Sequence, residues 1–328
     1  RPAAVRDPSR DQRPGERRND RAAGNGRARY RAVKPQFPRF PVLEECSVVH
    51  HSYIIGQYSP KCQVGLSQCR KPLGCRDLSR NLGPYAMPFR TMLFTPGNHP
   101  RKVAKVFDAG ADAVILDLED AVAIAEKPAT RAAVVEALKA RPVPRRPLGY
   151  VRVNALSTPF AYGDFQAVVG PWLDGIILPK LESVEELATA DWLLSQCERE
   201  AGLPEGSIDL LPIIETAKGE QAALAIASAD SRIKRLSFGA GDYTLDLGRD
   251  WSLGEGELLP IRHHMVSISR ATGLEPPIDS VYIHLNETEA FSASCDTVKA
   301  LGFQGKLCIH PGQIAAANAA FTPNAEQI

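Results

Sequence analysis

Charged side chains stand just after short apolar runs at several points in the second part of the sequence. Glu119 and Asp120 follow one such run, Glu215 follows another, and Asp242 follows a third. Arg152 stands at the end of a fourth run. An unpaired charge is costly to bury, so charges that gather at one edge of a fold need mutual pairing, a metal ion or a ligand. These residues therefore predict a binding site.

Two of the carboxylates, Glu215 and Asp242, could hold one cation if their runs form neighbouring strands. Such strands lie about 4.8 Å apart. Two carboxylates completed by water and substrate oxygens are typical of Mg²⁺ sites, and the lack of nearby cysteines favours Mg²⁺ or Mn²⁺ over Zn²⁺. Glu119 or Asp120 could support this site from the second coordination sphere. The planar guanidinium of Arg152 suits a carboxylate or enolate oxygen, so the expected ligand is a small oxo or hydroxy acid.

Eight short apolar runs alternate with longer helical stretches after residue 89, and this alternation defines the expected fold. The predicted strands are 91–94, 113–118, 149–153, 175–178, 210–214, 235–239, 279–284 and 306–309. The predicted helices are 100–109, 127–140, 183–201, 217–227, 257–272 and 287–301. Alternation predicts parallel strands, and a count of eight favours a closed α/β barrel, the (β/α)8 TIM barrel. An open dinucleotide-binding sheet is not favoured, because no GxGxxG follows a strand.

The composition of the 328-residue chain divides it into two parts. Residues 1–39 carry a formal charge of +8, and the remaining residues carry −7. A basic segment joined to an acidic globule is not typical of a nucleic-acid-binding domain. The Arg-, Pro- and Gly-rich start cannot bury much apolar surface, so we predict a largely disordered or poorly packed extension over 1–88. The barrel domain is then 89–328.

Further sequence features concern the cellular location. No run approaches 18 apolar residues, which excludes a predicted transmembrane helix, and no signal-peptide core stands near the start. The seven cysteines include no CxxC pair, which favours reduced thiols and a cytoplasmic protein. The Arg-rich start leaves the mitochondrial matrix as an alternative, although its prolines oppose the amphipathic helix of a targeting peptide.

Seven segments of the chain occur in an order and spacing that resemble a known family. They are RTMLFTPGN (90–98), AVILDLEDAV (113–122), VRVN (151–154), ILPK (177–180), PIIET (212–216), FGAGDYTLDLG (238–248) and GKLCIHPGQI (305–314). Together they resemble the citrate lyase β-subunit-like members of the HpcH/HpaI aldolase family. The resemblance implies a trimeric or hexameric TIM barrel that binds Mg²⁺. It also implies cleavage or formation of a carbon–carbon bond in malyl-, citramalyl- or citryl-CoA.

The resemblance also assigns roles to individual residues through the matching motifs. Glu215 of PIIET and Asp242 of GAGDY would hold the metal, and Arg152 of VRVN would bind and act on the substrate. The other substrate-binding residues that it implies are Phe94, Arg101 and Lys105 on the CoA side, and Ile309 and His310 of CIHP. On a helix, the four-residue spacing of Arg101 and Lys105 places both cations on one face.

The chain departs from the family pattern at two places. Gly241 stands where many relatives have Glu, next to the predicted metal ligand Asp242. The sequence ends at Ile328, whereas relatives continue into a C-terminal lid that in several lyases carries an Asp reaching into a neighbouring subunit's site. We therefore expect a barrel that lacks this lid, and either a truncated chain or the absence of that general base.

The implied reaction is a retro-Claisen cleavage of a CoA thioester to an acyl-CoA and a 2-oxo acid. Hydrolysis of the thioester on the same site is an alternative activity. A paralogue that binds CoA or oxo acids without turnover is an alternative of another class. Lys180 could act as a Schiff-base nucleophile in another type of aldolase, but the paired carboxylates favour a structural or electrostatic role for it.

Overall fold

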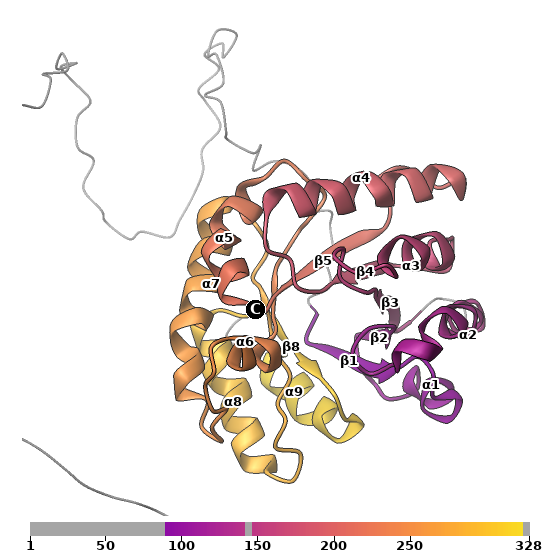
Figure 1. The fold of residues 1–328 in the computed structure, drawn as a ribbon. Coiled ribbons are helices and arrows are strands. Elements are labelled where there is room, and N and C mark those ends of the chain that lie inside the picture. The colour runs from indigo at the N-terminus through magenta and orange to yellow at the C-terminus, as the bar shows by residue number, and fades with distance from the viewer. Residues whose placement is uncertain (1–88, 142–145, 324–328) are drawn as a thin grey trace, which may run out of the picture. The chain divides into compact units, whose positions relative to one another are not determined.

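The computed structural model describes residues 89–141 and 146–323. Eight parallel strands close into a barrel in chain order, and β1 pairs with β8 (Figure 1). The strands are β1 (Thr91–Pro96), β2 (Ala113–Asp117), β3 (Leu148–Arg152), β4 (Gly175–Leu178), β5 (Asp209–Ile214), β6 (Ser237–Phe238), β7 (Ile278–Asp279) and β8 (Gly305–Cys308). The predicted (β/α)8 barrel is confirmed.

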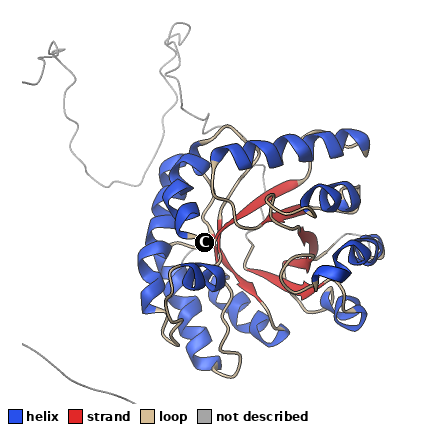
Figure 2. Cartoon of the chain, viewed as in Figure 1, coloured by secondary structure: helices blue, strands red, loops and turns tan. Residues whose placement is uncertain are grey.

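Helices surround this barrel on its outside (Figure 2). They are α1 (Pro100–Val106), α2 (Lys127–Lys139), α3 (Ala161–Val168), α4 (Val184–Glu200), α5 (Ala217–Ser228), α6 (Ala240–Asp246), α7 (Leu259–Thr272), α8 (Thr288–Leu301) and α9 (Ile314–Phe321), with short 3-10 turns η1 (Ile124–Glu126), η2 (Gly256–Leu258) and η3 (Pro311–Gln313). None of the helices in the described part of the chain is long and apolar enough to cross a membrane.

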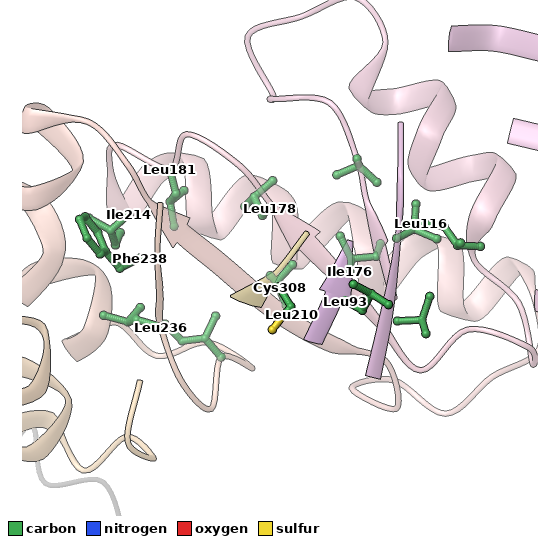
Figure 3. Close-up of a cluster of buried hydrophobic side chains, with 14 of the residues drawn as sticks. Leu93, Leu116, Ile176, Leu178, Leu181, Leu210, Ile214, Leu236, Phe238 and Cys308 are labelled. Atoms are coloured by element: carbon green, nitrogen blue, oxygen red, sulfur yellow. The ribbon is translucent and has the colours of Figure 1, made fainter. Parts of the chain in front are cut away.

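Alternate residues of the strands enter two different hydrophobic clusters. Leu93 and Leu116 belong to the larger cluster, which also contains the inner faces of the helices (Figure 3). Met92 and Ile115 belong to a smaller cluster that consists almost entirely of strand residues and fills the barrel. Because strand side chains alternate between two faces, this division identifies the residues that point into the barrel at each strand end.

The predicted elements differ from the structure mainly in strand β7 and in the short helices. The prediction of a strand over 279–284 was wrong in extent, because pairing ends at Asp279. Beyond it the Tyr282 carbonyl accepts a hydrogen bond from the Gln313 side chain instead of from a neighbouring strand. Helices α3 and α6 were not predicted, since each spans two turns and contains a glycine. The extension predicted over 1–88 lies outside the described residues.

The predicted helix ends are mostly confirmed. The Ser183 hydroxyl accepts a hydrogen bond from the Glu186 amide at the start of α4. The Glu186 carboxylate accepts from the Glu182 amide and not from the Ser183 amide, so the two residues do not form a reciprocal capping box. Gly273 and Gly302 follow α7 and α8 with φ of +74° and +108°, a backbone conformation that favours glycine.

Candidate active site

Three strands carry a charged residue that points into the barrel, and all three residues lie at the same end of the barrel. Asp117 ends β2, Arg152 ends β3, and the two are register partners across the sheet. Glu215 follows Ile213 at the end of β5, two residues on, so it has the same inward orientation. The strand alternation that builds the barrel core thus also directs these three side chains to its carboxyl end, where barrel enzymes place their chemistry.

Asp117 and Glu119 hold the guanidinium of Arg152 in one orientation. Its Nε and Nη2 donate to the two carboxylate oxygens of Asp117 at 2.7 and 2.6 Å, and its Nη1 lies 3.1 Å from Glu119 Oε2. The ring of Phe94 lies 4.9 Å from the guanidinium carbon. Burial alone would raise the pKa of Asp117, but the charge and hydrogen bonds of Arg152, together with two backbone amides, outweigh burial and lower it. Arg152 is thus a fixed cation in a bidentate pair.

Lys180 contacts carboxylates through both its backbone and its side chain. Its φ is +51°, a left-handed conformation that is uncommon for a residue with a side chain. The Lys180 amide donates to Glu215 Oε1 at 2.8 Å, while its Nζ lies 2.6 Å from Glu119 and 3.0 Å from Asp242. Burial would lower the pKa of Lys180, but the hydrogen bond and charge of Glu119 raise it. A firmly protonated amine is a poor Schiff-base nucleophile, which supports the electrostatic role.

Glu215 is a buried carboxylate at this end of the barrel, and it forms no ion pair among the described residues. Burial, together with the charges of Glu119 and Asp242, raises the pKa of Glu215 to about 8 despite the opposing effect of Arg152. Gly239 leaves room for it, since a Cβ there would lie 2.4 Å from Glu215 Oε2. The barrel therefore holds a carboxylate in a position where its negative charge is unfavourable without a further cation.

We call these charged residues together the carboxyl-end cluster. Its members are Asp117, Glu119, Asp120, Arg152, Lys180, Glu215 and Asp242. Five carboxylates thus face two cations, which leaves three formal negative charges unmatched. Within the described ranges, no three acidic, His or Cys side chains are grouped closely enough to hold a metal ion by themselves. A cation at Glu215 and Asp242 would need oxygens from water or substrate.

The structure places the remaining predicted residues outside this cluster. Arg101 and Lys105 are exposed on α1. Ile309 is 38% exposed after β8, and His310 accepts a hydrogen bond from the Gly312 amide at the start of η3. Their substrate contacts stay predictions. Asn154 lies near the cluster but is buried, and its side chain bonds to Lys127 and Asp164.

Asp117 is the member of the cluster to which the sequence analysis gave no role. Its position opposite Arg152 in parallel strands could have indicated an ion pair, because register partners on one face are neighbours. The predicted roles of Glu119 and Asp120 are refined in a similar way. Glu119 is buried between Arg152 and Lys180, whereas the Asp120 side chain is 55% exposed. Both carboxylates therefore belong to the surroundings of the Glu215 and Asp242 pair.

A parallel eight-stranded barrel with a charged site at the carboxyl ends of its strands defines the class of TIM-barrel enzymes. Residues 90–311 match the family model of HpcH/HpaI aldolase/citrate lyase. The chain therefore belongs to this family of carbon–carbon lyases. It is 37% identical over 239 residues to the citrate lyase subunit beta of Leuconostoc mesenteroides subsp. cremoris. This match covers 73% of this chain and 78% of the relative.

Other relatives extend this comparison. An L-malyl-CoA/beta-methylmalyl-CoA lyase of Cereibacter sphaeroides is 32% identical over 265 residues, covering 74% of this chain and 81% of the relative. A citrate lyase beta subunit from M. tuberculosis, solved with oxaloacetate and magnesium, has a TM-score of 0.59 and 30% identity over 72% of this chain and 98% of that one. The Mycobacterium tuberculosis protein CitE, solved with magnesium, acetoacetate and coenzyme A, has a TM-score of 0.58 and 31% identity. The match covers 73% of this chain and 82% of that chain.

Proposed function

We propose that the protein is a Mg²⁺-dependent lyase that cleaves a 3-hydroxy-3-carboxyacyl-CoA, of the malyl-, citramalyl- or citryl-CoA type, into an acyl-CoA and a 2-oxo acid. The observation that carries the proposal is the unmatched negative charge of the carboxyl-end cluster, centred on Glu215. The relatives support it, because they include a malyl-CoA lyase and structures solved with magnesium, oxo acids and coenzyme A.

The residues of the cluster fit a hard divalent cation. Glu215 and Asp242 offer only oxygen donors, and Mg²⁺ prefers such ligands. A nearby cation would favour the ionised form of Glu215 and oppose the burial that raises its pKa to about 8. When bound there, Mg²⁺ would supply Lewis-acid polarisation of substrate oxygens. Trimeric or hexameric assembly, cytoplasmic location and replacement by Mn²⁺ remain parts of the proposal.

The proposed reaction moves one proton and one electron pair. A base takes the proton of the 3-hydroxyl group, the carbon–carbon bond breaks, and its electron pair passes to the thioester as an enolate. Protonation of the enolate gives the acyl-CoA, and the other fragment is the 2-oxo acid. Arg152 would stabilise oxyanion charge in this sequence, because Asp117 and Phe94 fix its guanidinium before the reaction begins.

The nucleotide part of the thioester would meet cations outside the cluster. Arg101 and Lys105 are exposed one helical turn apart on α1, which follows β1 and the Phe94 position. Two cations at this spacing suit the diphosphate or the 3′-phosphate of CoA. Ile309 and His310, after β8, complete the proposed substrate contacts. Arg101 and Lys105 would then bind the substrate equally in the ground state and the transition state.

A product profile tests the proposed function. The purified chain is incubated with malyl-, citramalyl- or citryl-CoA and Mg²⁺, and 2-oxo acid and free thiol are both measured. A lyase releases one 2-oxo acid per acyl-CoA and no free thiol, and chelation of the metal stops the reaction. Release of thiol without 2-oxo acid would instead identify a thioesterase, and neither product from any ester would contradict turnover of these substrates.

A further inference from the structure

Lys127, at the start of α2, is a buried ammonium without a carboxylate partner among the ion pairs of the described residues. Its side chain is reached by three hydrogen-bond acceptors, the carbonyls of Leu118 and Glu119 at 3.0 and 2.6 Å and Asn154 Oδ1 at 2.7 Å. The residue is only 7% exposed. An ammonium has three donors and all three are used here, so this arrangement is specific to a lysine side chain.

The acceptors around Lys127 belong to the two chain segments that carry the carboxyl-end cluster. Leu118 and Glu119 leave β2, and Asn154 lies two residues after Arg152 at the exit of β3. Asn154 ties the same segments together, since its Nδ2 donates to the Leu118 carbonyl at 3.0 Å and to Asp164 on α3 at 2.7 Å. Lys127 and Asn154 thus connect the segments that follow β2 and β3.

The hydrogen bonds of Lys127 hold the backbone of Glu119 in place. Its carbonyl is held by Lys127, and its carboxylate then lies between Arg152 Nη1 at 3.1 Å and Lys180 Nζ at 2.6 Å. Loss of the ammonium would leave Asn154 Oδ1 without its donor, while the Leu118 and Glu119 carbonyls would each keep one other donor, the Asn154 side chain and the Val122 amide. A buried acceptor that loses its donor is costly, so the segment would shift to restore its hydrogen bonds or to reach water. A shift of Glu119 would release Arg152 and Lys180 from their present positions.

We propose that Lys127 is a positioning residue that acts through Glu119 on the orientation of Arg152 and Lys180. It touches neither the proposed substrate nor the proposed metal, and its effect on turnover rests on the proposed function. The competing interpretation is that Lys127 stabilises the fold and leaves the chemistry unaffected. The two interpretations differ in what happens to kcat in a variant that remains folded.

The test compares Lys127→Met with Lys139→Met. Lys139 lies on the same helix, and its side chain is 43% exposed and paired with Glu136, so it provides a matched control. In Lys127→Met we expect kcat to fall about 10²-fold, the loss typical of a misplacement near 1 Å, while KM for the thioester changes less than about twofold. Lys139→Met should retain both constants. An unchanged kcat in a folded Lys127→Met protein would overturn the proposal.

Hydrogen exchange provides a readout that does not depend on turnover. The amides of Glu119 and Ala121 donate to Asp117 at 2.9 and 3.0 Å, so exchange in residues 118–122 reports order in the segment that Lys127 holds. Exchange there should rise at least about tenfold in Lys127→Met, while β5 and α4 stay protected. Unchanged exchange in residues 118–122 would overturn the proposal, whether or not the wild type cleaves any of the esters. A wild type that cleaves none of the esters would contradict only the proposed function.

A milder variant keeps the proposal testable if Lys127→Met fails to fold. Asn154→Ala removes one of the three acceptors and leaves Lys127 with both carbonyls. We expect kcat to fall about tenfold in this variant, with KM again nearly constant. A folded Asn154→Ala protein with wild-type kcat and wild-type exchange over residues 118–122 would contradict the proposed positioning role of Lys127.

Discussion

Two of the buried groups of charged side chains in the described part of the chain differ in charge balance. In the carboxyl-end cluster, five carboxylates share two cations, and part of the cluster is open to solvent. The second group, which we call the α7 cluster, consists of Glu255, Arg262, Asp279 and Lys306. It lies between strands β7 and β8 and helix α7, it has two charges of each sign, and each of its residues is at most 2% exposed.

The difference in charge balance between the two clusters indicates different roles, stabilisation for one and binding for the other. In the α7 cluster, Arg262 bonds Asp279 at 2.8 and 3.0 Å and Glu255 at 2.9 Å, and Lys306 pairs with Asp279. Each charge there has a partner from the protein itself. The carboxyl-end cluster leaves negative charge unmatched, which is unfavourable until a cation arrives. A balanced buried cluster therefore indicates a structural role, and an unbalanced one indicates a site.

The largest expected effect comes from removing one charge of the unbalanced cluster. Glu215→Gln should lower kcat/KM at least about 10³-fold, since Lewis-acid stabilisation is worth several kcal/mol. The same change removes a carboxyl group whose ionisation is unfavourable in the metal-free protein, so thermal unfolding without Mg²⁺ should occur at an equal or higher temperature than in the wild type. A clear drop in the metal-free unfolding temperature would show that Glu215 is a structural group.

The matched change in the balanced cluster should have the opposite profile. Asp279→Asn leaves Arg262 and Lys306 without their shared anion, and breaking a buried pair in this way costs about 3–5 kcal/mol. Chemical denaturation should show this loss in the free energy of unfolding, while kcat/KM of the folded fraction stays within about twofold. A stability equal to the wild type would contradict the assignment of the α7 cluster to stabilisation.

The pH dependence of stability sharpens the same comparison. Burial would raise the pKa of Asp279, but the charges and hydrogen bonds of Lys306 and Arg262 together outweigh burial and lower the pKa. The stabilisation from Asp279 is therefore complete above the unfolded pKa of about 3.9 and is lost as pH falls through the lower folded value. The difference in unfolding free energy between wild type and Asp279→Asn should be constant from about pH 5 to 8 and shrink below about pH 4. A difference that grew toward low pH would contradict this sign.

A geometric change in the unbalanced cluster should have a somewhat smaller effect than removal of Glu215. Arg152→Lys keeps the charge but cannot reproduce the two hydrogen bonds to Asp117 together with the contact to Glu119. We expect kcat/KM to fall about 10²-fold, mainly through kcat. Steady-state kinetics check this, and a near-wild-type value would limit Arg152 to a structural ion pair.

The smallest expected effect lies outside both clusters. Neutralising Arg101 and Lys105 together should raise KM for the CoA ester severalfold and leave kcat nearly unchanged, because uniform binding is lost. The effect should shrink at high salt, since exposed charges are screened over about 8–10 Å. A short thioester without the nucleotide serves as the control. Equal impairment on that substrate would show that these residues do not bind CoA.

Local sequence patterns were sufficient to predict most of the barrel. Strands β1 to β5 and β8 were placed within a residue or two, because continuous apolar runs are typical of buried parallel strands. The extent of β7 could not be predicted, since it depends on the distant Gln313 side chain. Glu215 and Asp242 could be proposed from strand ends alone. The anchoring of Arg152 by Asp117 depends on the register of β2 against β3, and that of Glu119 by Lys127 depends on the fold of the loop between β2 and α2, and apolar runs alone predict neither.

Calorimetric titration with Mg²⁺ tests the central claim most directly, because it measures the cation without requiring turnover. The wild type should bind about one Mg²⁺ per chain, and the double variant Glu215→Gln/Asp242→Asn should lose this binding while remaining folded. Asp279→Asn, studied where it is folded, should retain it. Wild-type Mg²⁺ affinity in the double variant would contradict the assignment of the unbalanced cluster as a metal site.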